Sequence, residues 1–344
     1  MILGTEVIES GAESRQVFKK HAITRCIGSM FDTPATMNPL VCIHGGAWRD
    51  PKQTYNDFDP MVNQINDLLN NKNLNDKDKF YESHYMDKSK MYDQFELFSL
   101  DYELSPETRH PSHLINILLE LVIIRWRYDI EIVNLLGHSA GSTLITQLLP
   151  WEDILIKDSS NLIIDYFQDF RDFINCKSDF EYEELQKNLE FDITDKLKII
   201  NFIRFNIPKF DKIFLLDGIF KIDEMLIEYP NYKFFIEEAF ENEEKWLKNI
   251  NIFDHYTSET DKDVKQLILN KIKKEYSKLN KIVIIHSISD ELLSVIQPGY
   301  INSLLIKSGI DKSKIEFIIG DFGQHNDVYQ NLEVTKKIIE ILLK

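Results

Sequence analysis

Short, continuous apolar runs recur along the chain and are separated by longer segments of mixed polarity. Such runs are typical of strands that are buried on both faces of a parallel sheet. The runs predict strands at Leu40–Ile43, Glu96–Leu100, Ile132–Leu136, Lys212–Leu216, Ile282–Ile285 and Ile315–Ile319.

The segments between these runs carry apolar residues at the three-to-four-residue spacing of amphipathic helices. Helices are predicted near Asp57–Leu69, Pro111–Tyr128, Ser139–Leu149, Ser294–Lys307 and Asp327–Leu343. Alternation of strands and helices predicts an α/β fold with a mostly parallel, doubly wound sheet and right-handed crossovers.

Two segments interrupt this pattern. Asn70–Met91 is rich in Asn, Lys and Asp and indicates a surface insertion. Trp151–Pro208 is long, charged and aromatic, and it precedes the strand at Lys212–Leu216. We expect one α/β domain over residues 1–344, with 151–208 as either a cap over the active site or a solvated insertion without a role.

Composition and charge argue against several classes of function. The 344 residues carry a formal net charge of −16, which disfavours binding to nucleic acid. Cys26, Cys42 and Cys176 form neither a disulfide framework nor a zinc motif. The N-terminal residues show no basic segment followed by an apolar run, so we expect no signal peptide, and the longest apolar stretch, near Leu114–Ile124, is too short to span a bilayer. We expect a soluble protein in the reducing cytoplasm.

The strongest chemical signal is the pentapeptide Gly137–Gly141, with the sequence G-H-S-A-G. It follows an apolar run and opens a helical pattern, which is the strand–turn–helix setting of a nucleophile elbow. The sharp turn requires residues without bulky side chains beside the nucleophile. The sequence therefore predicts that Ser139 is the nucleophile of a serine hydrolase.

A serine nucleophile needs a base and an acid, which follow it in the order Ser, Asp, His in this fold class. His325 lies beyond the strand at Ile315–Ile319 and before the last helix, where the base is expected. Asp290 and Asp217 both follow strands and both satisfy the order. We favour Asp290 as the acid, because the acid usually follows the penultimate strand; Asp217 would then be a structural residue.

An oxyanion hole is predicted at the loop that follows the strand Leu40–Ile43. This loop has the sequence H-G-G-A-W, and its glycines Gly45 and Gly46 let backbone N–H groups point into the pocket. The N–H of Ala140, the residue after the nucleophile, is expected to supply the second donor.

The motifs together closely resemble those of the fungal kynurenine formamidases, the arylformamidases of tryptophan breakdown. The matching segments are H-G-G-A-W-R-D-P at 44–51, Y-E-L-S-P-E at 102–107, G-H-S-A-G at 137–141, F-L-L-D-G-I at 214–219, S-D-E-L-L at 289–293 and H-N-D-V-Y at 325–329. The resemblance runs from about residue 40 to the C-terminus and fails at 70–91, 151–208 and around 249–280.

This resemblance implies hydrolysis of N-formyl-L-kynurenine to L-kynurenine and formate, a reaction linked to NAD synthesis from tryptophan. It places the same roles on Ser139, Asp290 and His325. The implied partner is this small molecule, with no nucleic acid and no membrane, and the oligomeric state stays open, a homodimer included. We expect no cofactor and no metal, because a complete triad makes metal-activated water unnecessary.

Two residues of the oxyanion loop are candidates for binding the substrate. Trp48 would pack against the aryl ring, or it would anchor the loop in the core. Arg49 is a candidate for the amino-acid end of the substrate by proximity alone, and a solvated loop charge is the competing interpretation.

Two other functions compete with the formamidase. A short-acyl carboxylesterase would use the same triad and the same H-G-G loop, although the Trp after H-G-G-A argues mildly against it. A catalytically inactive scaffold would not need an intact Ser139, Asp290 and His325.

Overall fold

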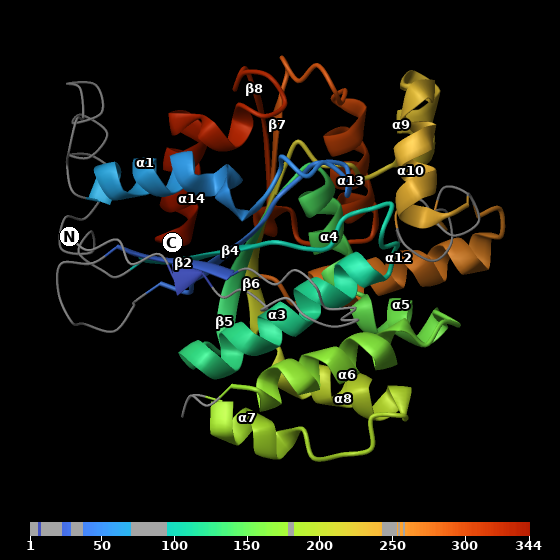
Figure 1. Cartoon of the computed structure of the whole chain (residues 1–344). Coiled ribbons are helices and arrows are strands. Elements are labelled where there is room, and N and C mark those ends of the chain that lie inside the picture. The colour runs from blue at the N-terminus through green and yellow to red at the C-terminus, as the bar shows by residue number, and fades with distance from the viewer. Residues whose placement is uncertain are drawn as a thin grey trace.

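The computed structural model describes residues 6–7, 23–28, 37–69, 95–177, 182–242, 253, 255–256 and 259–344. Its centre is one sheet of eight strands in the order β1-β2-β4-β3-β5-β6-β7-β8 (Figure 1). The strands are β1 (Glu6–Val7), β2 (Ile23–Gly28), β3 (Leu40–Ile43), β4 (Phe95–Leu100), β5 (Ile132–His138), β6 (Lys209–Leu216), β7 (Lys281–Ser287) and β8 (Ile315–Gly320).

The sheet is parallel from β4 to β8, and β2 pairs antiparallel with both β1 and β4. All six predicted strands are confirmed, whereas β1 and β2 were not predicted. The two unpredicted strands lie at one edge, so the predicted strands form the continuous parallel part of the sheet.

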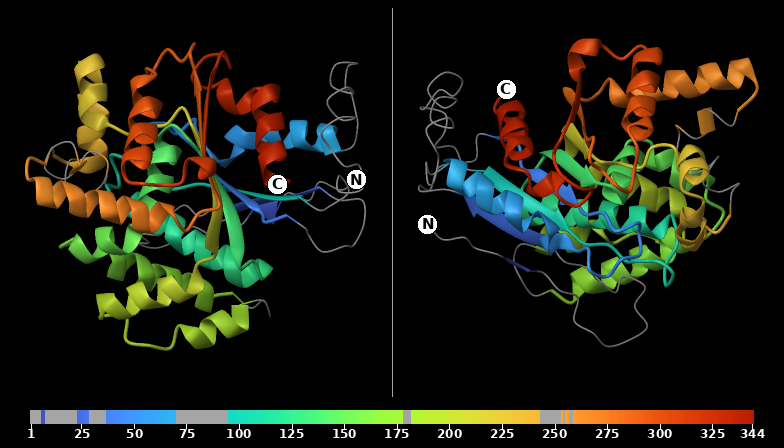
Figure 2. Two further views of the ribbon diagram at one scale, coloured as in Figure 1. Left: turned by 180° about the vertical axis from the view of Figure 1, so that it is seen from behind. Right: turned by 90° about the horizontal axis from the view of Figure 1, so that it is seen from above.

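Helices cover both faces of this sheet, as expected for a doubly wound fold (Figure 2). The longer ones are α1 (Asp59–Leu69), α3 (Ser112–Tyr128), α4 (Ala140–Leu148), α5 (Trp151–Lys157), α6 (Leu162–Asn175), α7 (Glu183–Asn188), α8 (Lys196–Asn206), α9 (Ile222–Glu228), α10 (Lys233–Phe240), α12 (Lys262–Tyr276), α13 (Ile296–Lys307) and α14 (Leu332–Leu342). The described residues also form four short 3-10 helices: η1 (Tyr55–Phe58), η3 (Pro230–Tyr232), η5 (Lys312–Lys314) and η6 (Val328–Gln330). The predicted helices are present in the structure.

Alternate residues of the central strands enter two separate apolar cores. On β6, Ile213 and Leu215 join the core that contains α3 and α4, whereas Phe214 and Leu216 join the core beneath α1 and α14. This alternation explains why the parallel strands are continuous apolar runs in the sequence, since neither face of the strand meets water.

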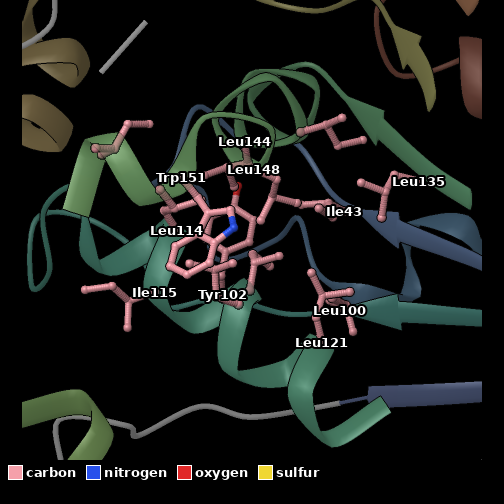
Figure 3. Packing of buried hydrophobic residues seen from close by; sticks show 14 of the residues in the cluster. Ile43, Leu100, Tyr102, Leu114, Ile115, Leu121, Leu135, Leu144, Leu148 and Trp151 are labelled. Carbon is pink, nitrogen blue, oxygen red and sulfur yellow. The ribbon is translucent and has the colours of Figure 1, made fainter. Parts of the chain in front are cut away.

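The segment 151–208 contains α5 to α8, and two of these helices cover α3. Helices α6 and α8 both contact α3, whose residues from Ser112 to Ile124 are all buried. A helix that is buried on all sides needs neighbours on its outer side as well as the sheet on its inner side. The segment starts with Trp151, which is inserted among Tyr102, Leu114, Leu144 and Leu148 (Figure 3).

Of the other two insertions, the structure describes only part of one. Residues 70–91 lie outside the described residues. Of residues 249–280, the structure describes α12, which contacts α13. Among the described helices, none combines the length and the apolar character needed to cross a bilayer.

Candidate active site

Ser139 occupies a sharp turn between β5 and α4. Its backbone angles, φ 52° and ψ −118°, lie in a region that residues other than glycine rarely adopt. Gly141 is required on the helix side of this turn, because a Cβ there would lie 2.0 Å from the Ile43 carbonyl oxygen. The backbone N–H of Ser139 donates to the Leu216 carbonyl at 2.9 Å, which ties the turn to β6. The geometry is that of a nucleophile elbow.

His325 and Asp290 form a buried pair beside this turn. His325 Nδ1 lies 2.8 Å from Asp290 Oδ2, and the side chains are 5 % and 0 % exposed. Because a carboxylate can only accept, Nδ1 donates the hydrogen and Nε2 stays free to act as a base. The other oxygen, Asp290 Oδ1, accepts the N–H groups of Leu292 and Leu293 at 2.8 and 2.9 Å.

Two neighbours fix the loop that carries His325. The His325 N–H donates to Glu291 Oε2 at 2.9 Å, and the His325 carbonyl accepts from His138 Nε2 at 2.9 Å. Burial, with a further contribution from His325, holds the pKa of His138 well below its ordinary value. His138 is therefore neutral and acts here as a hydrogen-bond donor that positions the loop.

Asp217, the alternative acid, makes no hydrogen bond to His325 among the described residues, whereas Asp290 does. Its Oδ1 accepts the N–H of Ser287 at 2.9 Å and lies 2.9 Å from His286 Nδ1. Its Oδ2 is buried without a hydrogen-bond partner among the described residues. Burial raises the pKa of Asp217, and the charge of Asp290 adds to the shift.

The predicted oxyanion loop passes directly beside the nucleophile. A Cβ on Gly45 would lie 2.9 Å from His138 Nδ1 and 3.0 Å from Ser139 Cβ, so a side chain at this position would push the loop away from the elbow. Gly46, Ala47 and Trp48 all have positive φ, at 84°, 50° and 59°. Ala140, on the opposite side, is the first residue of α4, where backbone N–H groups lack partners within the helix.

Buried side chains under the loop hold it in place. His44 Nε2 lies 2.9 Å from Asp101 Oδ1, and the His44 ring stacks on Tyr102 with 4.4 Å between centroids. The Tyr102 hydroxyl donates to the Gly45 carbonyl at 2.7 Å. These contacts keep the Gly45 backbone against the elbow.

Ser139 and His325 line one hollow of about 440 Å³, within the range of small-molecule sites. The described residues contain no hydrogen bond at Ser139 Oγ, and the catalytic contact is often long in the absence of substrate. The remaining lining residues are Gly46, Ala47, Arg49, Asp50, Pro51, Gln53, Ile219, Met225, Tyr232, Phe234, Phe235, Leu292, Leu293 and Asn326.

The prediction that residues 151–208 form a cap over the active site is wrong, because no described residue of this segment lines the hollow. Its helices pack on α3 instead, and Figure 1 shows α6, α7 and α8 far below α9 and α10. The cover comes from residues 219–235, at the start of the next crossover, together with Leu292 and Leu293. A cluster of aromatic residues soon after β6, from Tyr229 to Phe235, was the available signal in the sequence.

The structure favours the core-anchor interpretation of Trp48 over contact with substrate. Its side chain is 0 % exposed, packs edge-on against Phe240 at 4.8 Å between centroids, and does not line the hollow. Arg49, in contrast, does line the hollow.

Two groups of side chains come close enough to hold a metal ion. They are His138, Asp217 and His325, and Asp217, His286 and Asp290, with ligand atoms within 4.8 Å of one another. In the first group His138 already donates to the His325 carbonyl, and in the second Asp290 accepts from His325. A metal at the second group would compete with the hydrogen bonds that Asp290 accepts, and the metal-free site stays a prediction.

The sheet order, the elbow and the strand-end His–Asp pair define an α/β-hydrolase fold. Solved structures agree in fold: an arylesterase has a TM-score of 0.55 at 12 % identity, covering 99 % of this chain and 83 % of its own. Carboxyl esterase 2 from Tuber melanosporum has a TM-score of 0.52 at 12 % identity, covering 99 % and 85 %. No family model matches the chain.

Several curated proteins that are similar to most of this chain carry the same name, kynurenine formamidase. The chain is 28 % identical to the kynurenine formamidase of Scheffersomyces stipitis over 302 residues, which is 88 % of this chain and 89 % of the relative. It is 26 % identical to the kynurenine formamidases of Debaryomyces hansenii, over 94 % and 97 %, and Saccharomyces cerevisiae, over 89 % and 88 %. The predicted resemblance is confirmed, and so is the prediction of an enzyme of the hydrolase class.

Proposed function

We propose that this protein is a kynurenine formamidase, which hydrolyses N-formyl-L-kynurenine to L-kynurenine and formate through Ser139, His325 and Asp290. The observation that carries the proposal is the 2.8 Å contact between His325 Nδ1 and Asp290 Oδ2, with His325 and Ser139 on one hollow. The similarity to curated formamidases over most of the chain supports the choice of substrate.

In the proposed reaction, His325 Nε2 takes the proton of the Ser139 hydroxyl while Oγ attacks the formyl carbon. Asp290 keeps the His325 tautomer and stabilises the imidazolium that forms. The backbone N–H groups of the 45–46 loop and of Ala140 would stabilise the oxyanion, and losing one such donor costs about 10²–10³ in kcat.

The leaving group of this reaction is an aryl amine, which His325 protonates as the C–N bond breaks. A formyl ester on Ser139 remains, and a water activated by His325 releases it as formate. The acyl group carries only a hydrogen, so the approach of the Gly45 backbone to Ser139 leaves sufficient space. The apolar cover, with Phe234 and Leu292 on the hollow and 53 % and 39 % exposed, suits an aryl leaving group.

A substrate series separates this function from the short-acyl carboxylesterase. We expect kcat/KM to be highest for N-formyl-L-kynurenine and to fall steeply from formyl to acetyl and butyryl anilides. Equal or better rates on butyryl esters would contradict the formamidase and favour the esterase.

A further inference from the structure

Arg49 is a cationic side chain on the hollow, and neither the triad nor the oxyanion loop uses it. It lies three residues beyond Gly46, and its backbone N–H donates to the Gly46 carbonyl at 2.9 Å. Its side chain is 35 % exposed and lines the same hollow as Ser139. The position of the guanidinium is therefore coupled to the loop that borders the nucleophile.

Two contacts orient the guanidinium. Arg49 Nε lies 3.0 Å from Glu238 Oε2, and the Arg49 Cζ lies 4.8 Å from the centre of the Phe234 ring. Both partners come from α10, so the cover and the oxyanion loop meet at this side chain. Phe234 also lines the hollow, which places a ring face and a cation side by side.

The contact with Glu238 leaves one edge of the guanidinium available. In the part of the chain that the structure describes, the two terminal nitrogens of Arg49 make no hydrogen bond, and the 3.0 Å contact between Nε and Glu238 is an ion pair without hydrogen-bond geometry. The pair is about one third exposed, so solvent screens it and it orients Arg49 more than it neutralises it. The terminal nitrogens present the planar, two-pronged donor set that matches a carboxylate.

We infer that Arg49 is the residue that binds the α-carboxylate of the substrate's amino-acid end. This inference rests on the proposed function, since it names the subsite that takes the part of N-formyl-L-kynurenine remote from the formyl group. The aromatic cover takes the aryl ring, and Arg49 beside Phe234 takes the carboxylate attached to it. Arg49 thus determines which aryl formamides bind well, and Ser139 and His325 perform the chemistry on all of them.

The test compares N-formyl-L-kynurenine with N-formylkynurenamine, which differs only in lacking the carboxylate. The readout is kcat/KM for N-formyl-L-kynurenine divided by kcat/KM for N-formylkynurenamine. This ratio is measured in the wild type, in Arg49→Ala and Arg49→Lys, and in a control, Lys52→Ala. Lys52 is an exposed cation of the same loop that does not line the hollow, so its removal changes the net charge equally.

We expect the ratio to fall about 10- to 100-fold in Arg49→Ala, mainly through KM for N-formyl-L-kynurenine, the loss typical of a hydrogen-bonded charge pair. Arg49→Lys should recover part of the ratio, because it keeps the charge and loses the planar fork. Lys52→Ala should leave the ratio at the wild-type value.

An unchanged ratio in Arg49→Ala, or an equal fall in Lys52→Ala, would overturn the assignment while leaving the formamidase intact. Equal losses on both substrates would also overturn it, since they would indicate damage to the loop. A wild-type protein that cleaves neither formamide would contradict the proposed function and, with it, this role of Arg49.

Discussion

Two aspartates end neighbouring strands of the same sheet, and their surroundings differ. Both carboxylates are fully buried, Asp290 after β7 and Asp217 after β6. Asp290 accepts three hydrogens, from His325 Nδ1 and two backbone N–H groups. Asp217 accepts a backbone N–H at Oδ1, lies near His286, and has no partner among the described residues at Oδ2.

The difference shows that the donors around a buried carboxylate, and not its burial, identify the proposed acid. Asp290 accepts the hydrogen of His325 Nδ1, so it can fix the tautomer of His325 and stabilise the imidazolium that forms in the proposed reaction. Asp217 has fewer donors, and burial raises its pKa. Its contacts with Ser287 and His286 instead hold β7 against β6.

Asp290→Asn should have the larger effect on catalysis. An asparagine can present its NH₂ group to His325 and impose the wrong tautomer, and the expected fall in kcat is about 10³–10⁴. Steady-state kinetics on N-formyl-L-kynurenine measures it, and circular dichroism verifies that the variant is folded. A fall of less than about tenfold in a folded variant would remove Asp290 from the triad.

Asp217→Asn is the matched substitution at the neighbouring strand end. Because His325 Nδ1 is hydrogen-bonded to Asp290 and not to Asp217, we expect kcat to change by no more than about tenfold. The same assay measures it, side by side with Asp290→Asn. If the Asp217 variant were folded and lost the larger factor, the two assignments would have to be exchanged.

The smallest expected effect is a pH dependence of stability. The pKa of Asp217 is raised in the folded state, so the native protein holds this proton at pH values where the unfolded chain has released it. Its contribution is present below the unfolded pKa of about 4 and is lost as the pH rises through the folded pKa. Asparagine does not titrate there.

Urea unfolding of both proteins between acidic and neutral pH measures this contribution. The free energy of unfolding of the wild type should fall relative to that of Asp217→Asn as the pH rises above about 4. A difference that is constant, or that changes in the opposite direction, would show that Asp217 is charged at no cost in the folded protein.

Local patterns in the sequence predicted the strands and the placing of Ser139, Asp290 and His325. The elbow lies within five consecutive residues, and the other two positions follow from strand ends, because parallel strands bring their carboxyl ends to one edge. The order of residues does not separate Asp290 from Asp217, and the sequence favoured Asp290 only because the acid usually follows the penultimate strand. The choice depends on hydrogen bonds between segments far apart in the chain.

The cover of the hollow could not be predicted in the same way. The buried helix α3 requires neighbours on its outer side, and the segment that begins at Trp151 provides them. The position of this segment in the sequence, after the elbow, does not indicate that it packs on α3. Tyr232 and Phe234 line the hollow because α9 and α10 fold back over the strand ends, which no local period encodes. The sequence could not decide whether Trp48 anchors the loop or contacts the substrate. The two roles differ in the burial of the side chain, and burial depends on the tertiary structure.

The central claim is that Ser139 attacks the formyl group of N-formyl-L-kynurenine. The most direct measurement is the rate of L-kynurenine formation by the wild type and by Ser139→Ala, at equal concentrations of folded protein. We predict rapid turnover by the wild type and a loss on the order of 10⁵–10⁶ in kcat for Ser139→Ala, the scale seen when a serine nucleophile is removed. Comparable rates in the two proteins, or no L-kynurenine from the wild type, would contradict the account.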